Sequence, residues 1–120
     1  MNPLGVPGLR DYAVKNSRLV LHASSATKFE PGATPSISAD GNKNAIVWAI
    51  STKAWNGPDN TPAILYAFEA TKLGQPIYTS EQNSARDRAG MATRFVIPIV
   101  VGGRVYFGTR SEVEVYGLLK

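Results

Sequence analysis

The chain has no cysteine and only one histidine among its 120 residues. The absence of thiols excludes disulfide bonds, cysteine nucleophiles and thiolate metal sites. One imidazole cannot supply the several histidine ligands of a typical zinc site. Catalysis by His22 would need a serine and an aspartate placed beside it, and nothing in the sequence nominates either. We therefore expect His22 to be a packed or edge residue of a short apolar strand.

Charged residues are also scarce, at 18% of the chain. This share is low for a soluble domain and suggests that part of the surface is buried against another molecule. The formal net charge is +4, but the cations are scattered, whereas nucleic-acid-binding surfaces need a clustered basic stripe. We expect no nucleic-acid partner.

Long apolar runs are missing too. No run reaches the ~18 residues of a membrane-spanning helix, so we expect no membrane partner. The first eight residues lack the charged and apolar regions of a signal peptide. The sequence as given is expected to be either cytoplasmic or a processed or excised piece.

What the chain does contain is one pattern of strands and turns written twice. The first copy has a proline-marked strand from residue 34, a turn at Gly41, an apolar strand at 45–50 and a further strand at 63–70. The second copy has strands at 94–101, 104–109 and 112–118, with Gly102 and Gly103 at its first turn. Short strands separated by glycine turns predict antiparallel sheets.

The predicted fold is therefore all-β, with about two β-propeller blades of four antiparallel strands. Residues 75–80 give the first copy a fourth, outer strand, and residues 84–92 lack the apolar stripe of a packed helix. One domain is expected, in which residues 1–17 form an irregular N-terminal arm, with a short strand possible at 11–14. Residues 18–120 then form the two-blade unit.

Two blades cannot close a propeller. The second copy ends one strand short, while a spare strand precedes the first copy. This spare strand consists of Arg18, Leu19, Val20, Leu21, His22 and Ala23. We predict that it completes the blade of residues 94–119, within one chain or between chains. Three copies of two blades make six and four copies make eight, both within the roughly 4–8 blades of known propellers. The predicted partner is the chain itself, as a trimer rather than a tetramer.

Residues 67–78 resemble the tryptophan-docking motif of quinoprotein-like propellers, Ala-x-Asp-x-x-x-Gly-x-x-x-Trp. Here Glu69 replaces the aspartate, one residue is inserted before Gly74, and Tyr78 stands in for the tryptophan. The phrases Pro-Ser-Ile-Ser-Ala-Asp-Gly, Ile-Val-Trp-Ala and Val-Tyr-Phe-Gly-Thr resemble the C-terminal blades of bacterial and fungal pyrroloquinoline-quinone-like repeat proteins. The resemblance covers about residues 18–119. It implies a propeller fold and is compatible with a secreted or periplasmic location.

The resemblance does not extend to chemistry. Quinoprotein dehydrogenases hold their cofactor and Ca²⁺ with residues from many blades, which two blades cannot supply, so we expect no cofactor. Residues 40–44 have the initial spacing of a calcium loop, but Ala45 and Ser51 occupy the places where such a loop needs glycine and glutamate. No metal site is expected.

Three residues are candidates for binding a small polar ligand or a glycan. Trp55 lies in a loop rich in Gly, Pro and Asn, where its ring can pack at an interface or offer a stacking platform. Arg86 and Arg88 can bind a carboxylate through their guanidinium forks or form local ion pairs.

Three functions follow. The first is a non-enzymatic propeller module that self-associates into a ring, its ligand unknown. The second is a lectin-like carbohydrate-binding module. The third is the C-terminal piece of a larger quinoprotein-like dehydrogenase.

Overall fold

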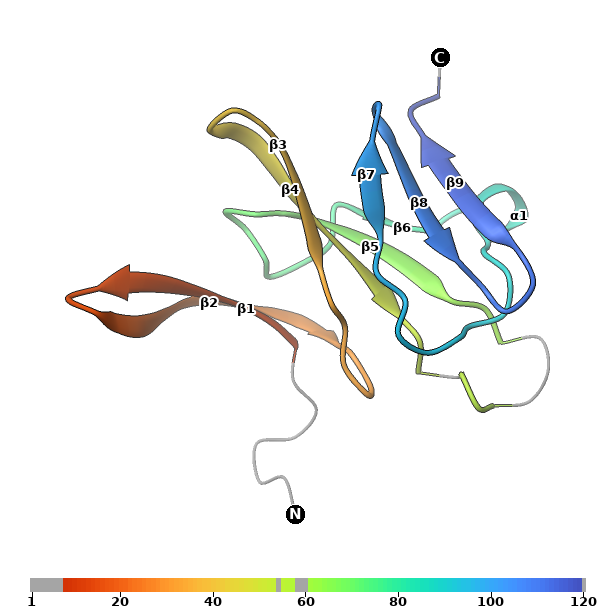
Figure 1. Cartoon of the computed structure of the whole chain (residues 1–120), viewed down its shortest axis with the longest axis horizontal. Helices are drawn as coiled ribbons and strands as arrows, with labels where there is room; N and C mark the ends of the chain where they lie inside the picture. Colours follow the sequence, from red (N-terminus) through yellow and green to blue (C-terminus); the bar gives the residue numbers. More distant parts are fainter. Residues whose placement is uncertain (1–7, 54, 58–60, 120) are drawn as a thin grey trace.

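The computed structural model describes residues 8–53, 55–57 and 61–119 and shows an all-β chain. In these ranges nine strands form three antiparallel sheets, arranged one after another in space as in the sequence (Figure 1). The helix found there, α1 (Ser84–Asp87), is a single turn. None of the described helical residues forms a segment long and apolar enough to cross a membrane. The all-β prediction is confirmed.

The first sheet is a hairpin of β1 (Gly8–Lys15) and β2 (Arg18–Lys28). Its two turn residues, Asn16 and Ser17, have positive φ values of 49° and 61°. Positive φ at both central positions is the signature of a type I′ turn, whose twist matches that of the strands. The short strand considered at residues 11–14 is present, as part of a longer strand, so the prediction of an irregular arm is wrong at residues 8–10 and 15. Residues 1–7 lie outside the described part.

The second, central sheet contains β3 (Ser36–Asp40), β4 (Lys43–Ser51), β5 (Ile64–Glu69) and β6 (Tyr78–Thr79), in that order. Gly41 closes the first turn with a φ of 59°. Sequence order and spatial order coincide, as expected for this copy. The outer strand β6 is shorter than the predicted strand at 75–80.

The third, last sheet contains β7 (Ile99–Val101), β8 (Arg104–Gly108) and β9 (Val113–Gly117). Gly102 and Gly103, with φ values of 57° and 73°, form the turn between the first two strands. The predicted strand at 94–101 begins only at Ile99. Phe95 lies in the left-handed region, with a φ of 59°, and this conformation interrupts an extended strand. This sheet has three strands in the described chain, not four.

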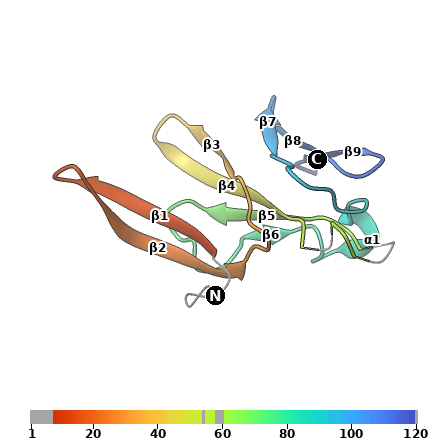
Figure 2. The same cartoon turned by 60° about the horizontal axis from the view of Figure 1, so that its bottom comes forward.

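Both faces of the central sheet are buried, because β4 and β5 are apolar at almost every position. Ile50 pairs with Leu65 on one face, and Val47 pairs with Phe68 on the other. The first face packs against Val105, Phe107 and neighbouring residues of the last sheet. The second face packs against Leu9, Phe29 and Ala23 at the base of the hairpin. The hairpin, the central sheet and the last sheet thus form three successive layers (Figure 2).

Truncating Phe68 tests the second of these cores. Its side chain is fully buried, and Phe68→Ala should lower the free energy of unfolding by about 3–5 kcal/mol, because it leaves a cavity between the hairpin base and the central sheet. Chemical denaturation at one protein concentration measures the loss. Ile37→Ala is the control, since Ile37 is 67% exposed and its truncation should change stability by about 0.5 kcal/mol or less. Equal losses for the two variants would contradict the layered core.

Candidate functional site

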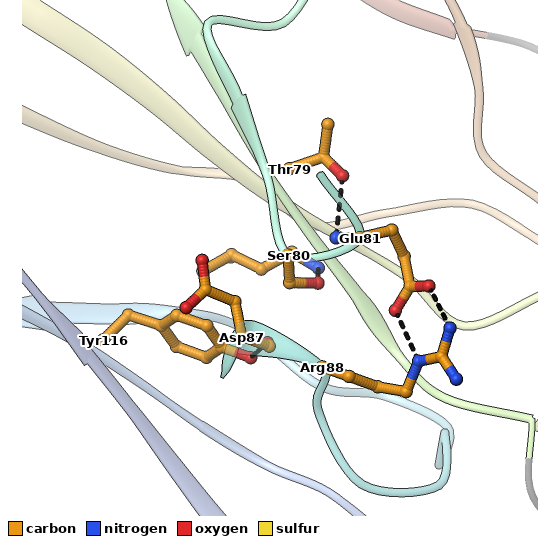
Figure 3. Close-up of polar contacts among 7 residues, drawn as sticks. Thr79, Ser80, Glu81, Asp87, Arg88 and Tyr116 are labelled. Carbon is orange, nitrogen blue, oxygen red and sulfur yellow. Dashed lines mark hydrogen bonds and ion pairs between the residues drawn. The ribbon is translucent and has the colours of Figure 1, made fainter. Parts of the chain in front are cut away.

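The two candidate arginines are engaged within their own connecting segment. Arg86 contacts the carboxylate of Asp87 through Nε at 2.5 Å and through Nη2 at 2.6 Å. Arg88 donates to both carboxylate oxygens of Glu81, at 3.2 Å from Nε and 2.8 Å from Nη2 (Figure 3). Both guanidinium groups therefore already bind a carboxylate of their own segment, as expected if these arginines form local ion pairs.

Trp55 has a different set of neighbours. The guanidinium carbon of Arg94 lies 4.2 Å from the centre of the Trp55 ring, within range of a cation–π interaction. The Trp55 backbone carbonyl accepts a hydrogen bond from Arg110 Nη2 at 2.8 Å. None of the hydrogen bonds, ion pairs or ring contacts described for Trp55 involves Arg86 or Arg88. The structure does not bring the three predicted ligand residues together.

The Arg94 guanidinium also lies over Phe95, 4.8 Å from that ring's centre. Phe95 is 89% exposed and ends the sequence Ala-Thr-Arg-Phe, residues 92–95. The related Ala-Thr-Lys-Phe at residues 26–29 ends at Phe29, which is only 2% exposed beneath the hairpin. The two copies of the motif therefore place the same aromatic residue in opposite environments.

Two open surface clefts lie near these loops. One, of about 480 Å³, is lined by Lys28, Lys53, Asn56, Tyr66 and nearby residues of the central sheet. The other, of about 330 Å³, is lined by Thr52, Arg94, Phe95 and residues around Gly32. Neither cleft is lined by Trp55, Arg86 or Arg88. Sequence reasoning therefore did not identify the residues that form the hollows of this surface.

A connected set of polar residues joins the central sheet to the last sheet through the segment around α1. The Tyr78 hydroxyl donates to Asp87 Oδ2 at 3.0 Å, and the Tyr116 hydroxyl donates to the Asp87 backbone carbonyl at 2.7 Å. Three residues on, the Gly90 amide donates to Glu114 Oε1 at 2.7 Å. Tyr78 comes from β6, whereas Tyr116 and Glu114 come from β9, so this segment ties the two sheets together.

The pKa shifts at this junction favour the protonation state in which each group makes its hydrogen bond. The Arg86 guanidinium, aided by the Tyr78 hydroxyl, lowers the pKa of the Asp87 carboxyl. Burial and the hydrogen bond to Asp87 raise the pKa of Tyr78. Burial, with the charge of Glu114 adding to it, raises the pKa of Tyr116 to about 12. At neutral pH the carboxylate accepts and both hydroxyls donate, which suits a structural junction.

Acid should weaken this junction. Because folding lowers the pKa of Asp87 below its ordinary value of 3.8, its stabilising effect is complete above that value. The effect is lost as the pH falls toward the lower folded pKa. Urea unfolding of wild type between about pH 5 and about pH 3 should therefore show a steeper loss of stability than Asp87→Asn, which cannot titrate there. Parallel pH profiles for the two proteins would show that Asp87 contributes nothing to acid sensitivity.

Within the described part of the chain, each end of the stack of sheets presents exposed apolar side chains. Beyond its packed base, the hairpin projects as an arm, residues 10–22, away from the other two sheets (Figures 1 and 2). Tyr12 pairs with Leu21, and Val14 pairs with Leu19. Cross-strand partners share a face, and these four side chains are between 42% and 74% exposed. We call this set the arm face.

The opposite end is the outer face of the last sheet. Ile99 pairs with Tyr106, which pairs in turn with Val115, so the three side chains form a row across three strands. Val101 and Val113 lie on the same face. Ile99, Val101, Val113 and Val115 are each more than half exposed. We call these five residues the sheet face. Large exposed apolar patches on soluble proteins are typical of interaction sites.

The chain matches no protein-family model, no curated protein and no solved structure. The junction and the two exposed faces are therefore the features from which a function can be inferred. Sequence reasoning predicted residues 18–23 as an assembly strand, which stays a prediction, and it did not single out Tyr12 and Val14 of the arm face. The signal was present in the alternation Tyr12, Val14 before the Asn16-Ser17 turn.

Proposed function

We propose that the chain is a non-enzymatic β-propeller module that self-associates into a closed ring. The central sheet and the last sheet are its two neighbouring blades. The quinoprotein-like resemblance of residues 18–119 supports this proposal, as does the up-and-down order of strands in both sheets. The paired carboxylate, guanidinium and hydroxyl groups between the sheets suit a structural role better than a catalytic one.

The contact between the two sheets agrees with blade packing. In a propeller the first strand of each blade lies nearest the central axis, so neighbouring first strands approach one another. Here β3 and β7, the first strands of their sheets, are in contact. The Ser36 hydroxyl donates a hydrogen bond to the Pro98 carbonyl just before β7. Further out, the two sheets separate around the apolar core and the Tyr116 junction.

The observation that carries the proposal is the pair of exposed apolar faces at opposite ends of the stack. Proteins avoid leaving large apolar patches and open strand edges in water. A stack with one such face at each end can cover both only by meeting further layers. In the described chain, β2 pairs with β1 and makes no contact with β9, so closure of the last sheet within one chain by residues 18–23 is wrong. The proposed layers therefore come from other copies, and three copies supply six blades, with one hairpin layer between each copy and the next.

Light scattering after size-exclusion chromatography tests the proposal. The expected mass is three times that of the 12.9 kDa chain, because a trimer closes a ring and covers both faces. A discrete tetramer would keep the ring and correct its number. A clean monomer at micromolar concentration would overturn self-association.

A further inference from the structure

We propose that the arm face of one copy packs on the sheet face of the next copy, so that the chains join head to tail. This inference rests on the proposed self-association and assigns the two surfaces that make it. The occupant of each exposed face is thus a second copy of this chain. Within one chain the two faces lie at opposite ends of the stack and cannot meet (Figures 1 and 2).

The chain already uses this kind of contact twice. The base of the hairpin covers one face of the central sheet, and the last sheet covers the other. In both places apolar side chains of two neighbouring layers share one buried cluster, as in ordinary sheet-on-sheet packing. The sheet face is the side of the last sheet that faces away from the central sheet. The arm face belongs to the hairpin, which is the first layer of the stack. A third contact of the same kind therefore packs the hairpin of one copy on the last sheet of another.

The two faces are alike in chemistry. The arm face offers Tyr12, Leu19, Leu21 and Val14 on a two-stranded ribbon, with Arg10 at its base. The sheet face offers a row of Ile99, Tyr106 and Val115, flanked by two valines, with Arg104 opposite Val101 at one edge. Aliphatic and aromatic residues on facing pleated surfaces pack closely and lose contact with water together.

Charge disfavours the symmetric alternative in which two arms meet. Residues 8–28 carry Arg10, Lys15, Arg18 and Lys28 against one carboxylate, Asp11, so that four minus one leaves a formal charge of +3 with His22 neutral. Residues 99–117 carry Arg104 and Arg110 against Glu112 and Glu114, and two minus two leaves zero. Two arms would repel each other, whereas an arm meets no net charge on the last sheet. Heterologous contacts of this type close into rings when the rotation between copies allows it.

A mixing experiment tests the assignment. One variant, Leu19→Lys with Leu21→Lys, loses its arm face but keeps its sheet face. The other, Val113→Lys with Val115→Lys, loses its sheet face but keeps its arm face. Each should be monomeric alone, and an equimolar mixture should give a one-to-one dimer, because one intact face of each kind remains. Masses are measured by light scattering at the highest soluble concentration. Ile77→Lys, which changes an exposed residue outside both faces, should assemble like wild type.

The outcomes separate the two proposals. A monomeric wild type overturns self-association and this assignment with it. An assembled wild type combined with self-association of the Val113/Val115 variant would show contacts between arms. Self-association of the Leu19/Leu21 variant would show contacts between sheets. Either result overturns the head-to-tail contact alone, as does a wild type that assembles while the mixture of variants stays monomeric.

A second test does not depend on lysines being tolerated in the strands. Since the natural chain has no cysteine, single Leu19→Cys and Val115→Cys variants can be mixed under oxidising conditions. The head-to-tail contact predicts a disulfide-linked heterodimer in denaturing electrophoresis. Mixing Leu19→Cys with Ile77→Cys is the matched control and should give no such product above background. Crosslinking that is equal in the two mixtures would overturn the assignment.

Discussion

The central sheet cannot exist without a layer on each side. Its two middle strands, β4 and β5, place apolar side chains alternately on both faces, with Leu65 fully buried on one face and Phe68 on the other. A sheet of this kind would expose one apolar face to water if either neighbour were missing. The hairpin base and the last sheet provide these two covers. The need for a layer on each side of the central sheet therefore follows from the composition of two strands.

The last sheet is held in place mainly by its contacts with the central sheet and with the α1 segment. It has three short strands, and one of its faces is exposed. Two contacts hold it against the central sheet. One is the apolar core around Val105 and Phe107, and the other is the hydrogen bond that the Tyr116 hydroxyl donates to the Asp87 carbonyl in α1. Apolar packing sets the distance between the sheets, and the directional hydrogen bonds set their orientation. This division leaves the outer face of the last sheet exposed.

Much of the fold could be predicted from the sequence because its signals are local. The apolar run at 45–50 and the glycines at 41, 102 and 103 identify strands and turns by residue type alone. The hairpin was predicted only in part, because its tight turn uses Asn16 and Ser17 rather than glycine. The partners of Asp87 could not be predicted, since Tyr116 lies 29 residues away in the chain. The positions of Trp55 and Arg94 likewise depend on how two loops meet in space.

The hydrogen bond from Ser36 to the Pro98 carbonyl has a consequence for the geometry of growth. When copies join head to tail, the rotation from one layer to the next decides whether the assembly closes into a ring or grows as an open filament. Ser36 joins the start of the central sheet to the residue just before the last sheet, so it lies where the rotation between these two layers is set. In the proposed assembly, a different rotation at this point would turn a closed ring into an open helical filament.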